Sequence, residues 1–150
     1  MLRVAVQTEP FDEGAELAAL RADGVGGIAS FTGVVRGGPT EKHGLTELQL
    51  DHYPGMTERA LTQLAETAVA RWHLSGATLI HRVGALHPGD PIVFVGTASP
   101  HRAAALEACA FLIDRLKTDA PFWKRETFAD GRSAWVEARA TDAVTATRWG

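Results

Sequence analysis

The segment Ser99-Pro100-His101-Arg102 combines a common helix-capping residue with two side chains that bind anions. Serine is favoured as an N-cap and proline at the first helical position, so the segment predicts a helix start with His101 and Arg102 in the first turn. Cations there oppose the helix dipole, and a bound anion such as a phosphate would explain them. Two solvated side chains beside a cap are the alternative that the pattern leaves open.

A second segment, KTDAPFWKRE at residues 117–126, places two lysines on either side of bulky, stiff residues. Lys117 falls in the expected last turn of that helix, where a cation also suits the dipole, and for this lysine alone a structural role is the simpler interpretation. Lys124 and Arg125 follow directly after Pro121-Phe122-Trp123. Such a segment can wall a pocket and partly desolvate an ammonium group, which favours proton transfer near neutral pH.

Arg36 ends an apolar stretch just before Gly37-Gly38. An arginine at a strand end beside a glycine loop can hold a phosphate or a carboxylate through two parallel hydrogen bonds. Taken alone, however, an ordinary surface arginine explains the position better.

The spacing of the histidines and the position of the single cysteine do not favour metal binding or nucleophilic catalysis, the usual functions of these residue types. The six histidines form no HxH or HExxH pair, so we expect no metal site and no metal cofactor. His52 and His81 fall in strand patterns and are expected to be structural. Cys109 lies among alanines in mid-helix and is expected to be a buried thiol rather than a nucleophile. Any sulfur chemistry would therefore need sulfur from another protein.

Periodicity predicts the elements that must position these residues. Helices are expected from Asp12 to about Arg21, from Met56 to Trp72, and from the Ser99-Pro100 start to about Lys117. The expected strands lie at 2–6, 25–35, 45–53, 77–83 and 92–98, with a short strand after Phe122-Trp123 and another at 133–138. The strands at 77–83 and 92–98 are expected to form a hairpin. The expected inner helix faces include Met56, Ala60, Leu61, Leu64, Ala65, Ala68, Val69 and Trp72 in the second helix, and Leu106, Ala110, Ile113 and Leu116 in the third.

Three helices among six or seven mostly antiparallel strands predict an α+β fold, and a length of 150 residues suits one domain spanning residues 1–150. The net charge of -3 argues against a general nucleic-acid binder. No apolar run approaches the roughly 20 residues that a membrane span needs, and the first ten residues lack the layout of a signal peptide. A cytoplasmic location is therefore expected.

Six segments carry a family resemblance. They are FTGVVR (31–36), LDHYPGMTE (50–58), IHRVGALHPGD (80–90), IVFVGTASPHR (92–102), LKTDAPFWKRE (116–126) and WVEAR (135–139). Together, and in this order, they resemble the large, catalytic subunits of molybdopterin synthase, the MoaE family. The resemblance is weak in the first two dozen residues and in the loop at 37–44.

The resemblance implies an α/β-hammerhead-like fold and a homodimer that forms a heterotetramer with a small ubiquitin-like sulfur-carrier subunit. The carrier's C-terminal Gly-Gly thiocarboxylate would supply sulfur to cyclic pyranopterin monophosphate (precursor Z). Two transfers would form the dithiolene of molybdopterin, in molybdenum cofactor biosynthesis. The implied enzyme is a sulfurtransferase without a cofactor of its own, and neither nucleic acid nor a membrane is implied as a partner.

The resemblance also implies roles for individual residues. The family's functional, catalytic lysines correspond to Lys117 and Lys124, which would also contact the substrate. The rest of the implied anion and substrate site consists of Arg36, His101, Arg102, Arg125 and Glu126.

Two other classes of function remain open. A non-catalytic module for a nucleotide or a phosphorylated metabolite would suit Arg36, His101 and Arg102 equally well. An adaptor for a ubiquitin-like protein would need no small-molecule site. The two lysines flanking Pro121-Phe122-Trp123 favour the enzyme.

Overall fold

The computed structural model describes residues 1–37 and 44–136, which form two four-stranded sheets and three helices. The first sheet has the order β1-β4-β6-β2, with β1 at Leu2–Gln7, β4 at Gly76–Arg82, β6 at Pro91–Ser99 and β2 at Gly27–Val34. β1 runs parallel to β4, and β6 runs antiparallel to both β4 and β2. The α+β prediction is confirmed, with eight strands in the described residues where six or seven were expected.

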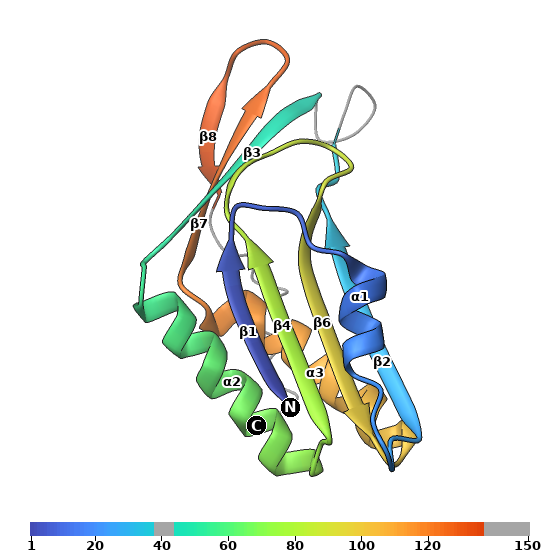
Figure 1. The fold of residues 1–150 in the computed structure, drawn as a ribbon. Helices are drawn as coiled ribbons and strands as arrows, with labels where there is room; N and C mark the ends of the chain where they lie inside the picture. The colour runs from blue at the N-terminus through green and yellow to red at the C-terminus, as the bar shows by residue number, and fades with distance from the viewer. Residues whose placement is uncertain (38–43, 137–150) are drawn as a thin grey trace.

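Two long helices, α2 (Met56–Trp72) and α3 (Arg102–Asp119), cover one face of this sheet, and the short α1 (Glu13–Ala19) lies on the other (Figure 1). The main core forms between the long helices and the sheet, and it contains Leu61, Leu64, Leu79, Val95, Phe111 and Leu112. Asp12 caps α1 as expected, with its side chain accepting from the Ala15 backbone N–H at 3.0 Å.

Two residues that we expected on the inner helix faces lie outside. Leu106 of α3 is 62% exposed and Met56 of α2 is 53% exposed. In α3 the buried face instead consists of Ala105, Ala108, Cys109, Phe111, Leu112 and Leu116. Three of these six residues, Ala105, Ala108 and Cys109, are small, so hydrophobicity alone does not mark this face.

The second sheet has the order β5-β3-β7-β8, with β5 at Gly84–Leu86, β3 at Leu45–His52, β7 at Phe122–Phe128 and β8 at Ser133–Val136. It extends beyond one end of the first sheet (Figure 1). A smaller core lies on its inner face, built from Val35, Leu45, Leu48, Leu50, Val83 and Leu86. β4 and β6 pair as predicted, but β5 interrupts the expected hairpin, because it leaves the first sheet to pair with β3.

The start of α3 differs from the prediction. Ser99 is the last residue of β6, where it pairs with Gly27, and Pro100 follows as a bend. The helix begins at Arg102, with His101 as an N-cap in extended conformation. The Ser99 hydroxyl accepts a hydrogen bond from the His101 backbone N–H at 3.1 Å. Pairing with a distant strand thus overrides the local capping signal, and of His101 and Arg102 only Arg102 lies in the first turn.

None of the helices in the described residues is long and apolar enough to cross a membrane.

Gly26 and Gly27 let the chain pass directly against the start of α3. A Cβ atom on Gly26 would overlap the carbonyl oxygen of Pro100, and one on Gly27 would lie 3.2 Å from the Cα of Arg102. Both obstacles are backbone atoms, which cannot rotate away as a side chain can. These two glycines therefore help to fix where α3 begins.

We predict that Gly26→Ala lowers the free energy of unfolding by about 1–3 kcal/mol, because the new methyl group overpacks against backbone. Gly14→Ala is the matched control: in α1 its methyl group meets only an Asp12 side-chain oxygen at 3.4 Å, so it should be neutral or stabilise by up to about 1 kcal/mol. Urea denaturation of the three proteins measures both. Equal midpoints for the two variants would contradict the close approach.

Candidate functional site

The inner face of the second sheet carries one of the two candidate lysines. In β7, Lys124 lies opposite Leu50 of β3. Residues directly opposite each other in an antiparallel pair point to the same side, so Lys124 is on the face where Leu50 is buried. Glu126 is on that face too, opposite Leu48, and is half-buried. Lys124 is exposed. Its positive charge is therefore accessible to solvent although the neighbouring residues on this face of the sheet are apolar.

Arg125 belongs to the opposite, outer face of the same sheet. It lies beside Trp135 of β8, with its guanidinium 5.8 Å from the ring centroid. Trp123 shares this face and meets Tyr53 edge-to-face at 4.0 Å between ring centroids. The motif WKRE therefore divides between two faces: Trp123 and Arg125 point one way, Lys124 and Glu126 the other.

Lys117 lies in the last turn of α3 and is exposed. The link from α3 to β7 is short, since the helix ends at Asp119 and β7 begins at Phe122. This link is anchored by Thr57 of α2, a fully buried residue whose hydroxyl donates to the Pro121 carbonyl at 3.0 Å. The same hydroxyl accepts from the Tyr53 backbone N–H at 3.0 Å. Thr57 was not singled out in the sequence, where it is one polar residue at a helix start.

His81 of β4 supports the beginning of β7. Its ring stacks on Phe122, with centroids 3.9 Å apart and planes inclined by 22°. Its Nδ1 is 2.8 Å from the carbonyl oxygen of Arg82. Because a carbonyl only accepts, Nδ1 carries the proton and Nε2 the lone pair. The expectation of a buried, hydrogen-bonded histidine is confirmed.

The environment of His81 keeps the ring neutral. Burial lowers the pKa of His81 to about 4, the charges of Lys124 and His52 act in the same direction, and the hydrogen bond to Arg82 opposes them. Lys124 is thus electrostatically coupled to this ring from the neighbouring sheet. The Nε2 atom of His52 lies 3.8 Å from a carboxylate oxygen of Glu58.

Arg36 lies at the same end of the first sheet as the lysines. It follows Val35, whose backbone N–H donates to the Asp90 carbonyl at 2.8 Å and whose carbonyl accepts from the Gly89 N–H at 2.9 Å. The side chain of Arg36 is exposed. Gly37 then passes against β3, since a Cβ there would come within 2.8 Å of the Leu45 side chain. The chain between these contacts holds Arg36 beside the second sheet.

His101 and Arg102 lie at the other end of the molecule. Arg102 begins α3 and Lys117 lies in its last turn, so at about 1.5 Å per residue they are roughly 22 Å apart along the helix. Both His101 and Arg102 are exposed. One chain therefore brings Arg36, Lys117 and Lys124 to one end and His101 with Arg102 to the opposite end.

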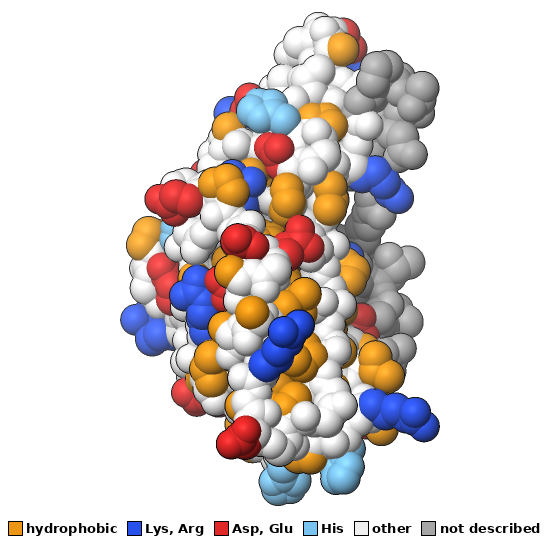
Figure 2. Space-filling view, turned by 45° about the vertical axis from the view of Figure 1, so that its right-hand side comes forward, with side chains coloured by type: hydrophobic (Ala, Val, Ile, Leu, Met, Phe, Trp, Pro, Cys, Tyr) orange, Lys and Arg blue, Asp and Glu red, His pale blue; other side chains and the backbone are white. Residues whose placement is uncertain are grey.

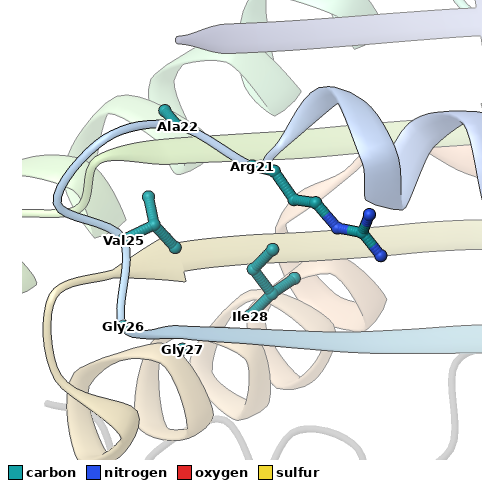
Figure 3. A pocket seen from close by; sticks show the side chains of 6 residues that line it. All are labelled: Arg21, Ala22, Val25, Gly26, Gly27 and Ile28. Carbon is teal, nitrogen blue, oxygen red and sulfur yellow. The ribbon is translucent and has the colours of Figure 1, made fainter.

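A shallow cavity of about 230 Å³ lies near the second of these ends. Figure 3 shows it beneath the loop that follows α1, with the side chains of Val25 and Ile28 projecting into it. Its wall at Gly26 and Gly27 backs onto α3, but the cavity is lined by none of the residues singled out for chemistry. Basic and acidic side chains are interspersed on the face seen in Figure 2, which shows no continuous basic patch.

Cys109 is buried in α3, and burial raises the pKa of its thiol to about 11. The prediction of a buried thiol is therefore confirmed, and the raised pKa disfavours the thiolate, which is the reactive form. Within the described residues, no group of three His, Cys, Asp or Glu side chains is placed to hold a metal ion.

Comparison with known proteins places the chain among close relatives. Residues 6–119 match the family model described as MoaE protein. A molybdopterin synthase catalytic subunit from Ralstonia nicotianae is 50% identical, with 100% of this chain and 85% of the relative covered.

Two solved structures support the same placement. A molybdopterin biosynthesis MoaE protein from Burkholderia ambifaria has a TM-score of 0.83 at 46% identity, covering 100% of this chain and 99% of that protein. Molybdopterin synthase from Staphylococcus aureus has a TM-score of 0.81 at 29% identity, covering 88% and 95%.

We predict that the buried neutral His81 makes stability fall in mild acid. The folded pKa is about 4 against 6.5 for the ordinary group, so between these values the unfolded chain binds a proton that the folded chain does not. The stability is fully present above pH 6.5 and is lost towards pH 4, by roughly 3 kcal/mol at about 1.36 kcal/mol per pKa unit.

Urea denaturation of the wild type between pH 7 and pH 4 measures this slope. His81→Phe should make it shallower, whereas the control His87→Phe should leave it unchanged because the His87 side chain is 60% exposed. A slope that His81→Phe does not alter would show that His81 is not the group responsible.

Proposed function

Because this chain belongs to the MoaE family, we propose that it is a catalytic subunit of molybdopterin synthase. In this function it transfers sulfur from the C-terminal thiocarboxylate of a small ubiquitin-like carrier subunit to cyclic pyranopterin monophosphate. The observation that carries the proposal is the short, anchored link between α3 and β7, which holds Lys117 and Lys124 on either side of Pro121. The chain is a sulfurtransferase that forms the dithiolene of molybdopterin.

The chemistry needs two cations near one reacting carbon. The carrier's thiocarboxylate sulfur attacks an oxygen-bearing, electrophilic carbon of the pterin side chain. A carbon–sulfur bond forms as the carbon–oxygen bond breaks, and the oxygen takes up protons and leaves as water. Water then cleaves the bond between sulfur and the carrier's acyl carbon, which leaves sulfur on the pterin and a carboxylate on the carrier. Negative charge develops and protons move in both steps, and the ammonium groups of Lys117 and Lys124 stabilise that charge and exchange those protons.

The sulfur comes from the partner. Cys109 is buried, and burial raises the pKa of its thiol, which argues against Cys109 as the sulfur donor. The partners in this proposal are the carrier with its Gly-Gly thiocarboxylate and a second copy of this chain, giving a heterotetramer. We place the protein in the cytoplasm as a single domain of residues 1–150.

A dimer also resolves the separation of the candidate residues. We assign Arg36 and Glu126 to the same substrate site as the lysines, whereas the expected site residue Arg125 lies on the outer face of the sheet beside Trp135. His101 and Arg102 lie roughly a helix length away from the lysines. A ligand the size of a phosphorylated pterin does not span that distance within one chain. We therefore assign His101 and Arg102 of one copy to the site that contains Lys117 and Lys124 of the other, where they bind the substrate phosphate.

Replacing the lysines tests the catalytic role. We expect Lys117→Ala and Lys124→Ala to lower product formation by ~10²–10⁴, the usual range for a positioned proton-transfer group. Arginine should rescue neither site, because it keeps the charge but does not release its proton at useful pH. The assay mixes the protein with thiocarboxylated carrier and precursor and measures molybdopterin.

Cys109→Ala is the control and should remain active. If Lys117→Arg kept activity within a few-fold of wild type, Lys117 would act only as a positive charge and not as a proton-transfer group. A wild type that binds precursor without forming product would favour the phosphate-binding module, and one that binds carrier alone would favour the adaptor.

Mixed dimers test whether the site is shared. Arg102→Ala and Lys117→Ala should each be impaired alone, the former through at least about tenfold weaker precursor binding. In a dimer containing one copy of each, one of the two shared sites has no substitution, so an equal mixture should recover about a quarter of wild-type activity. A site built within one chain predicts no recovery, because every site then contains one lesion. The precursor concentration should stay below KM, because a saturating concentration would hide the weaker precursor binding of Arg102→Ala.

A further inference from the structure

We propose that Thr57 is a positioning residue for sulfur transfer: its buried hydroxyl sets the path of the chain between α3 and β7, and thereby the relative placement of Lys117 and Lys124. This inference rests on the function proposed above. Thr57 lies in the first turn of α2 and does not need to touch the substrate.

The first observation is the place where the pairing of β3 with β7 ends. The last backbone pair joins His52 to Phe122. One step further in the same register, Tyr53 would lie opposite Pro121. In a regular antiparallel ladder, the N–H and carbonyl groups of neighbouring strands bond to each other directly. Here the Thr57 hydroxyl joins them instead, accepting from the Tyr53 N–H and donating to the Pro121 carbonyl, both at 3.0 Å. A side chain of α2 thus continues the ladder by one step.

The second observation is that this hydroxyl is itself held firmly. Thr57 is fully buried, and its backbone N–H donates to the Tyr53 carbonyl at 2.9 Å. It is therefore fixed to Tyr53 through both its backbone and its side chain. Proline has no N–H, so the carbonyl is the backbone group through which Pro121 can be held. The hydroxyl connects the link to the end of β3 and to the start of α2.

The third observation is the position of Pro121 between the two lysines. Pro121 follows Lys117 by four residues and precedes Lys124 by three. Lys117 lies in the last turn of α3 and Lys124 lies in β7. The shape of the link therefore determines how the backbones that carry the two lysines lie relative to each other.

Loss of the hydroxyl would change that shape. The Tyr53 N–H and the Pro121 carbonyl would either stay buried without partners, which is costly, or move together into a direct bond. Both responses alter the path from α3 into β7. A displacement of about 1 Å at a reacting group can lower a rate by about 10²-fold.

Steady-state kinetics with thiocarboxylated carrier and precursor separate positioning from stability. Thr57→Val keeps the shape of the side chain but removes the hydroxyl, and we expect kcat to fall about ten- to hundredfold. The KM for precursor should change little, because the phosphate site proposed at His101 and Arg102 is not altered. Thr57→Ser loses a buried methyl group but keeps the hydroxyl, and should stay within a few-fold of the wild-type kcat.

Thr97→Val is the matched control. Thr97 is also fully buried, and its hydroxyl donates to the Ala105 carbonyl at 2.6 Å, towards the other end of α3. This variant loses the same kind of hydrogen bond and should keep the wild-type kcat. If Thr57 served stability alone, Thr57→Val would keep the wild-type kcat as well, and only its midpoint in urea would move. That result would overturn the proposal, as would an equal loss of kcat in Thr97→Val.

A second comparison keeps the test decisive if Thr57→Val does not fold. Thr57→Ser and Thr57→Ala differ only in the hydroxyl oxygen, and alanine is the residue most compatible with a helix. The serine variant should have a kcat at least about tenfold above that of the alanine variant. Equal kcat in these two variants would contradict a role of the hydroxyl in turnover.

The two proposals fail in different ways. Absence of molybdopterin with the wild-type protein would refute the proposed function. Backbone NMR would then still decide whether the hydroxyl shapes the link: amide resonances of residues 117–124 should shift in Thr57→Val and stay close to the wild type in Thr57→Ser. Normal wild-type turnover with an unaffected Thr57→Val would refute only the positioning role.

Discussion

The pairing of β6 along both of its edges is the constraint on which the rest of the molecule depends. It is hydrogen-bonded to β4 on one side and to β2 on the other, and all but its first two residues are buried. A shift of one residue would exchange its two buried faces, so its register is fixed. The ends of β6 therefore stay a strand length apart. Arg36 and the lysines gather near its beginning, and His101 and Arg102 follow its end.

The second sheet places Lys124 on an apolar face, and contacts from α2 and β4 fix the backbone at the start of its strand. Lys124 stands opposite the buried Leu50, where its aliphatic stem can pack while the ammonium reaches water. The start of β7 is fixed at two successive residues: Thr57 holds the Pro121 carbonyl and His81 stacks on Phe122. An exposed and otherwise adaptable side chain thus begins from a backbone with little freedom, which suits a group that must meet a reacting carbon.

Local patterns predict the elements well, but not the relations between distant ones. The steps of three and four in α2 and the strand pattern of β3 depend only on neighbouring residues, and both elements form as predicted, with Met56 as the one exposed exception on the stripe of α2. The start of α3 is mispredicted because Ser99 pairs with Gly27, far away in the chain. In the same way, the sequence motif identifies Lys124 as a candidate. The face of the second sheet on which Lys124 lies is set by the register of β7 with β3, which the motif does not contain. The distance between Arg36 and Arg102 is a property of the sheet, which no segment contains.

Arg102 and Lys117, at the two ends of α3, stand in opposite relations to the helix dipole. Lys117 in the last turn is stabilising, typically by about 0.3–1 kcal/mol, and Arg102 in the first turn opposes the dipole by a similar amount. That first turn contains no acidic residue, and the N-cap His101 makes no side-chain capping bond. Folding therefore accounts for Lys117 but not for Arg102. A bound anion at this end would make the electrostatic energy of the first turn favourable, because the guanidinium of Arg102 and the free backbone N–H groups would both attract the anion. The electrostatics of α3 thus favour a phosphate site at Arg102, whereas the case for Lys117 rests on the chemistry of sulfur transfer.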